Sequence, residues 1–271
     1  MMAAVAIDPR ICAAQALLGQ FCAGDPGRSV ALTFCAHKGP RYKRVTIDAA
    51  GTVLRPVASV IKVALVMALY DLAHTGLIDL DEQMPLEALG ATRYCSIMAA
   101  FDKQRRLSLR ELAAISLITS DNPVAVLLEE RVGQQAVGAV LARAGIARDR
   151  QMRVGFREEE LGPENRANQM SALDVIEMFE LLRSERRYGE IVLALENNLR
   201  NARIPALLPD EVVIAHKTGS LNGVVNDAGI VRLGVESFVV AFLADDQADP
   251  VATTNDIAEC AKELYELILA G

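Results

Sequence analysis

Ser59 and Lys62 stand three residues apart at the start of an apolar segment, PVASVIKVALVMALYDLAH (56–74). In a helix, residues i and i+3 lie on one face, so the amine can reach the hydroxyl. A serine becomes nucleophilic when an adjacent base takes its proton, and the free N–H groups of a helix N-terminus favour the developing negative charge. The alternative is an N-cap serine followed by a surface lysine. The apolar neighbours of Lys62 favour the chemical interpretation, because desolvation lowers the pKa of an amine toward that of a base.

Two further motifs carry hydroxyl and amine groups. A Ser-Asp-Asn sequence at 120–122 joins two helical patterns, and by itself it is typical of an interhelical turn and cap. A Lys-Thr-Gly sequence at 217–219 lies in an apolar strand, where its polar side chains could equally face solvent; Gly219 has room for another backbone or a ligand to come close. A cleft between the helices and the strand would bring two hydroxyls and two amines together.

Strand patterns at the two ends of the chain enclose a long helical region. Alternation of apolar residues predicts strands at 29–37, 41–49, 211–220, 226–234 and 237–245. Apolar residues three and four apart predict helices at 8–22, through much of 60–205, and at about 252–269.

The simplest arrangement of these elements is an α+β fold, with one antiparallel sheet formed from both termini and an inserted all-helical domain, because it leaves no isolated ribbon. We therefore predict an α/β domain of about five strands at 1–57 and 206–271. The all-helical domain is expected at 58–205, with the active site in the cleft between the two.

The composition narrows the class of protein. A chain of 271 residues with 52% hydrophobic and 23% charged residues has a substantial core, and a net charge of −7 without a basic tract argues against nucleic acid. The longest apolar stretch, 63–69, is too short to span a membrane, and we expect a monomer. The first residues lack the pattern of a signal peptide, which indicates either a cytoplasmic protein or a chain whose signal has been removed.

Cysteine and histidine spacing predicts no disulfide framework or metal site, and we expect no organic cofactor. The five cysteines show no CxxC pair, and their apolar settings indicate small buried side chains. The three histidines lie far apart, without the spacing of a zinc site.

With SxxK, SDN and KTG in this order, the chain resembles class A serine β-lactamases and other penicillin-recognising serine hydrolases. The resemblance covers nearly the whole chain and implies a β-lactamase/D,D-peptidase-like fold. It implies that Ser59 is the acylated nucleophile and Lys62 its proton acceptor. Ser120 would relay a proton to the leaving nitrogen, assisted electrostatically by Lys217.

The same resemblance implies the substrate contacts. Asn122 would hydrogen-bond the side-chain amide of the substrate, and Thr218 would contact its carboxylate beside Gly219. The backbone N–H groups of Ser59 and Ser220 would form the oxyanion hole.

Of three polar residues near the third motif, Arg203 and Asp227 have two interpretations each and His216 has one. Arg203, 14 residues before Lys217, matches one family position of a carboxylate-binding arginine, but solvated surface arginines are common. Asp227 is either a partner for the amines or a turn aspartate. His216 should point to the opposite face of its strand from Lys217, and we assign it no catalytic role.

The residue that removes the acyl group is the least defined. Family members carry ExxLN in an Ω-shaped loop, where the glutamate orients water. Glu158 fits ExxL here, but Gly162 replaces the asparagine, and Asn168 falls where an aspartate commonly closes the loop. An acidic run is also typical of a solvated face, and Glu159 and Glu164 are alternatives to Glu158.

This loop decides between two functions. A working glutamate predicts a β-lactamase, whereas its absence predicts a D,D-carboxypeptidase, an esterase-like hydrolase or a protein that stays acylated by β-lactams. The expected partner is a small molecule, either a β-lactam or a D-Ala-D-Ala-like peptide. The preferred class of β-lactam depends on the loops around 93–105 and 157–168.

Overall fold

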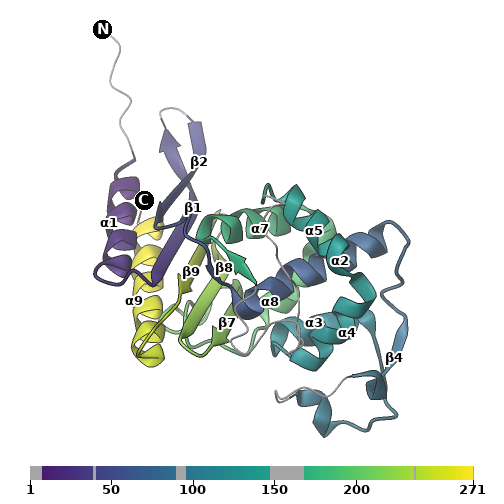
Figure 1. Cartoon of the computed structure of the whole chain (residues 1–271). Helices are drawn as coiled ribbons and strands as arrows, with labels where there is room; N and C mark the ends of the chain where they lie inside the picture. Colours follow the sequence, from purple (N-terminus) through teal and green to yellow (C-terminus); the bar gives the residue numbers. More distant parts are fainter. Residues whose placement is uncertain (1–7, 39–40, 90–95, 147–167, 235, 271) are drawn as a thin grey trace.

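A five-stranded antiparallel sheet forms one half of the molecule, with the strand order β2-β1-β9-β8-β7 (Figure 1). The computed structural model describes residues 8–38, 41–89, 96–146, 168–234 and 236–270. The strands are β1 (Arg28–Lys38), β2 (Arg41–Ala49), β7 (Ile214–Leu221), β8 (Val224–Leu233) and β9 (Glu236–Ala244). Because β1 pairs with β9, the two ends of the chain meet in one sheet, which confirms the predicted fold class.

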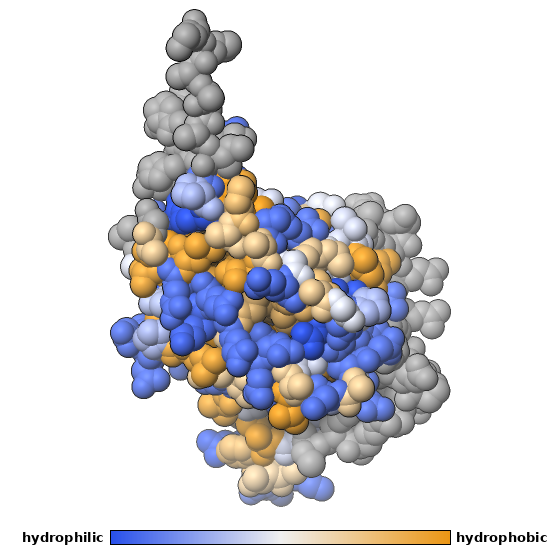
Figure 2. Space-filling view, turned by 90° about the vertical axis from the view of Figure 1, so that its left-hand side faces the viewer, coloured by the Kyte–Doolittle hydropathy of each residue, from blue (hydrophilic) through white to orange (hydrophobic). Residues whose placement is uncertain are grey.

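Helices α1 (Pro9–Cys22) and α9 (Pro250–Leu269) cover one face of this sheet. Alternate strand residues such as Leu32 and Phe242 pack against Leu18 and Leu264 of these helices. The outward side of this layer, turned to the viewer in Figure 2, mixes hydrophilic with hydrophobic residues. The apolar side of each helix is therefore the one turned toward the sheet.

The helical half packs against the other face of the sheet (Figure 1). Its helices are α2 (Lys62–His74), α3 (Leu109–Ile118), α4 (Asn122–Val132), α5 (Gln134–Arg143), α7 (Ala172–Ser184) and α8 (Gly189–Glu196). Every residue of α2 from Lys62 to Tyr70 is buried, as its apolar composition predicts. Ala31, Ala228 and Ala241 on the sheet face this helical core, where small side chains let the two layers approach closely.

Short strands and 3-10 turns interrupt the region predicted to be helical. Two ribbons pair β3 (Arg55–Pro56) with β6 (Gln169–Met170), and β4 (Gln83–Pro85) with β5 (Arg106–Ser108). The 3-10 turns are η1 (Ala58–Ile61), η2 (Leu86–Ala88), η3 (Ile97–Ala100) and η4 (Arg186–Tyr188). Strands of two or three residues are too short to show alternation in the sequence. The domain boundaries proposed from the sequence stay a prediction.

Three properties of the described ranges bear on the class of protein. No helix in them is long and apolar enough to cross a membrane. Cys12, Cys22, Cys35 and Cys260 carry free thiols there, while Cys95 lies outside the described residues. The same ranges contain no cluster of three or more His, Cys, Asp or Glu side chains that could hold a metal ion.

Candidate active site

Ser59 lies in the 3-10 turn η1, directly before helix α2, and its side chain is half-buried. The preceding residue, Ala58, has a φ of 48°, in the left-handed region that non-glycine residues rarely adopt. Such a conformation persists only where the surroundings hold it. The backbone therefore turns sharply where Ser59 is presented.

The segment before Ser59 is held on three sides. The Val57 N–H donates to the Asn168 carbonyl oxygen at 2.9 Å, and the Asn226 amide donates to the Pro56 carbonyl oxygen at 2.8 Å. A Cβ atom at Gly219 would overlap the Val57 carbonyl oxygen, so only glycine lets strand β7 approach this turn. The close approach predicted at Gly219 is thus to a backbone.

The Lys62 amine, fully buried at the start of α2, contacts the 120–122 motif. Its Nζ donates to the Ser120 carbonyl oxygen and to Asn122 Oδ1, both at 2.6 Å, and lies 3.4 Å from Ser120 Oγ. The described hydrogen bonds of this amine thus run to the start of α4, and its contact with Ser59 stays a prediction.

The Ser120 hydroxyl lies between two amines. Lys217 Nζ donates to Ser120 Oγ at 2.9 Å and to the Thr218 carbonyl oxygen at 2.9 Å. Ser120 has a φ of 62°, so this turn between α3 and α4 is also held in an unfavourable conformation. The first and third motifs of the sequence therefore meet at the second.

Asp121 holds this turn in place. Its Oδ1 accepts from the Val124 N–H at 3.1 Å and caps α4, while Oδ2 accepts from the Ser96 hydroxyl at 2.6 Å and the Ile97 N–H at 3.1 Å. The cap predicted from the sequence is present, and the same carboxylate also ties the 96–100 segment to the site.

Burial sets the protonation of both lysines. Desolvation, and to a lesser degree the Arg200 charge, lowers the pKa of Lys217 from its usual 10.5 to about 7. Desolvation followed by the nearby Lys217 charge lowers the pKa of Lys62 well below 10.5, while Asp121 opposes this shift. Near neutral pH the site can therefore hold a neutral amine next to an ammonium.

Arg203 is engaged with the strands rather than freely solvated. Its Nη1 donates to the Gly219 carbonyl oxygen at 3.2 Å and to the Asn226 carbonyl oxygen, and its Nη2 donates to Ser220 Oγ at 2.7 Å. Burial lowers its pKa, partly offset by Asp227. These bonds connect Arg203 to the C-terminal end of β7 and to β8.

Asp227 and His216 form a separate buried cluster. Asp227 accepts from the Ile204 N–H at 3.1 Å and lies 2.9 Å from His216 Nδ1. The other ring nitrogen of His216 is 3.0 Å from Asn201 Oδ1. His216 thus points away from Ser120, as alternation predicts, and the described hydrogen bonds of Asp227 do not involve the lysines.

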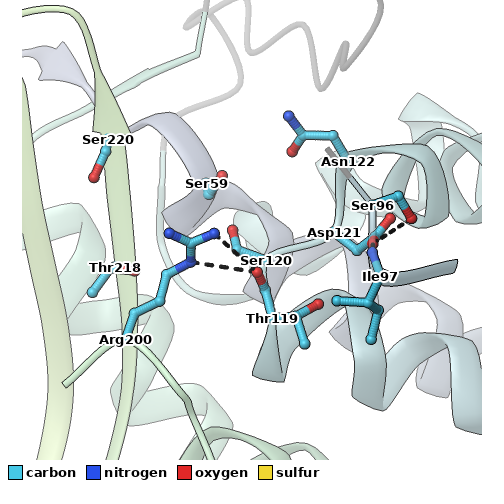
Figure 3. Close-up of a pocket in the computed structure, with 10 residues that line it drawn as sticks. All are labelled: Ser59, Ser96, Ile97, Thr119, Ser120, Asp121, Asn122, Arg200, Thr218 and Ser220. Carbon is cyan, nitrogen blue, oxygen red and sulfur yellow. Dashed lines mark hydrogen bonds between the residues drawn. The ribbon is translucent and has the colours of Figure 1, made fainter. Parts of the chain in front are cut away.

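Ten of the described residues line a pocket of about 410 Å³ between the two halves (Figure 3). They are Ser59, Ser96, Ile97, Thr119, Ser120, Asp121, Asn122, Arg200, Thr218 and Ser220. Lys62 and Lys217 are buried and reach this lining through their hydrogen bonds to Ser120. Glu158, Glu159 and Glu164 lie outside the described residues.

Several residues of the site were not predicted. Arg200 enters the pocket, and Asn226 and Asn198 brace its walls. The position of Arg200, three residues before Arg203, was the only signal in the sequence.

The chain belongs to the Beta-lactamase enzyme family, whose family model matches residues 34–268. The extended-spectrum β-lactamase PER-1 of Pseudomonas aeruginosa is 25% identical over 236 residues, covering 79% of this chain and 75% of PER-1. The protein is accordingly a hydrolase of the β-lactamase kind, a family that acts on small molecules.

Solved structures share the fold. A β-lactamase from Sphaerobacter thermophilus superimposes with a TM-score of 0.81 at 22% identity, over 97% of both chains. PBP-A superimposes with a TM-score of 0.78 at 18% identity, over 98% of this chain and 100% of PBP-A. The same arrangement of sheet and helices therefore occurs in a β-lactamase and in PBP-A.

Proposed function

We propose that the protein opens the β-lactam amide through an acyl-enzyme on Ser59. The observation that carries this proposal is the Ser120 hydroxyl, held 2.9 Å from Lys217 Nζ and 3.4 Å from Lys62 Nζ in a pocket that Ser59 also lines. The motif resemblance and the relationship to PER-1 support the same reaction.

In the first step, Ser59 Oγ attacks the lactam carbonyl carbon. Neutral Lys62 takes the hydroxyl proton, and its lowered pKa supports this role. The backbone N–H groups of Ser59 and Ser220 stabilise the oxyanion. When the C–N bond breaks, Ser120 gives its proton to the ring nitrogen and recovers one from the ammonium groups beside it. Asn122 and Thr218 orient the substrate.

The carboxylate of the substrate needs a cationic partner. The family resemblance assigns this role to Arg203, which donates to Ser220 at the rim of the pocket. No metal or organic cofactor takes part in the proposed reaction, since the nucleophile, base and acid are all side chains.

In the second step, water attacks the ester carbonyl and frees Ser59. We assign the orientation of this water to Glu158, with Glu159 and Glu164 as alternatives. The substitution of Gly162 for the family asparagine favours a second candidate, a D,D-carboxypeptidase, an esterase-like hydrolase or a slowly deacylating β-lactam-binding protein. A point mutant of PBP-A, which shares the fold, has been solved as an acyl-enzyme complex with penicillin G.

Turnover and intact mass should be followed together after mixing the protein with a chromogenic cephalosporin. Many turnovers support the β-lactamase, whereas a stable adduct after one equivalent supports the second candidate. Absence of both would reject acyl transfer to β-lactams altogether.

Labelling with a fluorescent penicillin tests the nucleophile. Ser59→Ala should abolish covalent labelling, because it removes the attacking oxygen, while Ser184→Ala, an exposed serine at the end of α7, should label like the wild type. Covalent labelling retained by Ser59→Ala would refute the assignment.

A further inference from the structure

Arg200 presents its guanidinium inside the pocket. The residue lies in the segment between α8 and β7, and its side chain extends from the Thr218 side toward Ser120, below Ser59 (Figure 3). It is exposed, in contrast to the two buried lysines. Among the described residues that line the pocket, Arg200 is therefore the cation that an entering ligand meets directly.

The position of Arg200 is fixed from both walls of the pocket. Its Nε and Nη2 point at the Thr119 carbonyl oxygen at 3.4 and 3.3 Å. Its backbone N–H donates to Asn198 Oδ1 at 2.8 Å, and the buried Asn198 amide donates to the His216 carbonyl oxygen at 2.9 Å. Thr119, at the C-terminal end of α3, thus holds the guanidinium, while β7 holds the backbone of Arg200 through Asn198.

Arg200 lines the pocket and keeps N–H donors for a ligand, whereas Arg203 is bonded to the strands beside it. A guanidinium has five N–H donors, and the contacts with Thr119 leave both N–H groups of Nη1 without an acceptor among the described residues. The two Nη groups of Arg203 donate to strand carbonyls and to Ser220, and Arg203 is not part of the pocket lining.

The chemistry at Ser120 locates the anion. In penicillins and in D-Ala-D-Ala-like peptides, the carboxylate is attached to the carbon next to the leaving nitrogen. Ser120 protonates that nitrogen in the proposed reaction, so the carboxylate must lie close to Ser120. Arg200 contacts Thr119, the residue directly before Ser120. Thr218 lies on the opposite side of Arg200 from Thr119 (Figure 3).

We propose that Arg200 binds the carboxylate of the substrate, with Thr218, and that Arg203 acts as a positioning residue for Ser220. This inference rests on the proposed function and replaces Arg203 by Arg200 as the direct partner of the carboxylate. Charge supports it, since Arg200 lies near two lysines whose pKa it lowers, and a bound anion reduces that repulsion.

The test compares benzylpenicillin with its methyl ester, which has the same ring without the negative charge. Second-order acylation rate constants are measured for the wild type, Arg200→Gln, Arg203→Gln and Arg186→Gln, by intact mass where the adduct accumulates and as kcat/KM for ring opening where it turns over. Arg200→Gln should slow acylation by the acid about 10- to 100-fold, as expected for the loss of charge-assisted hydrogen bonds, and change acylation by the ester less than about threefold. Arg203→Gln should slow both compounds to a similar extent. Arg186→Gln, an exposed arginine in η4, should change neither.

The outcomes separate this inference from the function on which it rests. Normal wild-type acylation with an unchanged Arg200→Gln rate on the acid would overturn the role of Arg200 alone. A loss confined to the acid in Arg203→Gln would return the carboxylate to Arg203. Absence of acylation in the wild type would overturn the proposed function and the inference with it.

Discussion

Replacing Lys217 by methionine should reduce the dependence of the unfolding free energy on pH. The Lys217 ammonium is fully buried, and burial lowers its pKa from 10.5 to about 7. Between these two values the unfolded chain holds a proton that the native protein has released. The stability of the wild type must therefore rise with pH in this window, and methionine, similar in shape but uncharged, removes that contribution.

The size of the effect follows from the shift. Each pH unit well inside the window changes the unfolding free energy by about 1.4 kcal/mol. Between about pH 6.5 and about pH 8.5, partial titration near pH 7 reduces the two-unit change to about 2 kcal/mol. Over this range, the unfolding free energy of the wild type should therefore rise by about 2 kcal/mol more than that of Lys217→Met. The Lys217 charge also lowers the pKa of Lys62. Its removal therefore raises the pKa of Lys62, which further reduces the dependence of the unfolding free energy on pH.

Urea denaturation at several pH values measures this difference. Far-ultraviolet circular dichroism is the suitable probe, since the chain contains no tryptophan. Lys103→Met removes an exposed lysine and should give a curve parallel to that of the wild type. Parallel curves for Lys217→Met and the wild type, differing by less than about 0.5 kcal/mol over this range, would refute the reasoning.

Two further substitutions test how the site is positioned. Gly219→Ala should destabilise the fold by about 1–3 kcal/mol and lower kcat/KM about 100-fold, because the new Cβ displaces the Val57 carbonyl before Ser59. Gly138→Ala, where a Cβ meets no atom within 4 Å, is the matched control in thermal melting and kinetics, and equal effects of the two would contradict this explanation. Asp121→Ala should lower stability in urea denaturation by about 1–2 kcal/mol through the lost α4 cap, whereas Asp121→Asn, which keeps an acceptor oxygen, should recover much of it. Equal losses in both variants would show that the cap is not the cause.

Much of the fold was predictable because alternation and helical spacing record which face of each element is buried. Strand β2 matches its predicted range of 41–49, and β9 (236–244) differs from the predicted 237–245 by one residue at each end. Strand β7 begins at Ile214 rather than at 211, since the Val212 N–H bonds back to the Pro209 carbonyl oxygen and closes a turn there. Local hydrogen bonds of this kind leave no trace in an apolar pattern.

The site residues that belong to a sequence motif were predictable. Those placed by contacts between segments far apart in the chain were not. The approach of Lys217 to Ser120 follows once both are placed in one cleft. Arg200 gave no comparable signal, because its position depends on Thr119 and Asn198, which come from opposite walls of the pocket. The hydrogen bonds of Lys62 were likewise set by where α4 begins, rather than by the helix on which Lys62 lies.

The charges in the pocket affect both proton transfers of the proposed acylation. The attack by Ser59 needs a neutral amine to take its proton. The cleavage of the C–N bond needs an ammonium beside Ser120, from which a proton reaches the leaving nitrogen. In the free protein, the Arg200 charge contributes to lowering the pKa of Lys217. If the substrate carboxylate binds Arg200, it neutralises that charge and raises the pKa of Lys217 again, so the amine gains its proton as the substrate arrives. Arg200 also lowers the pKa of Lys62, but less than Lys217 does, so the charged Lys217 still holds the pKa of buried Lys62 below its usual range and favours its neutral form. The same binding event would therefore divide the roles of base and acid between two lysines that both begin with weakened proton affinity.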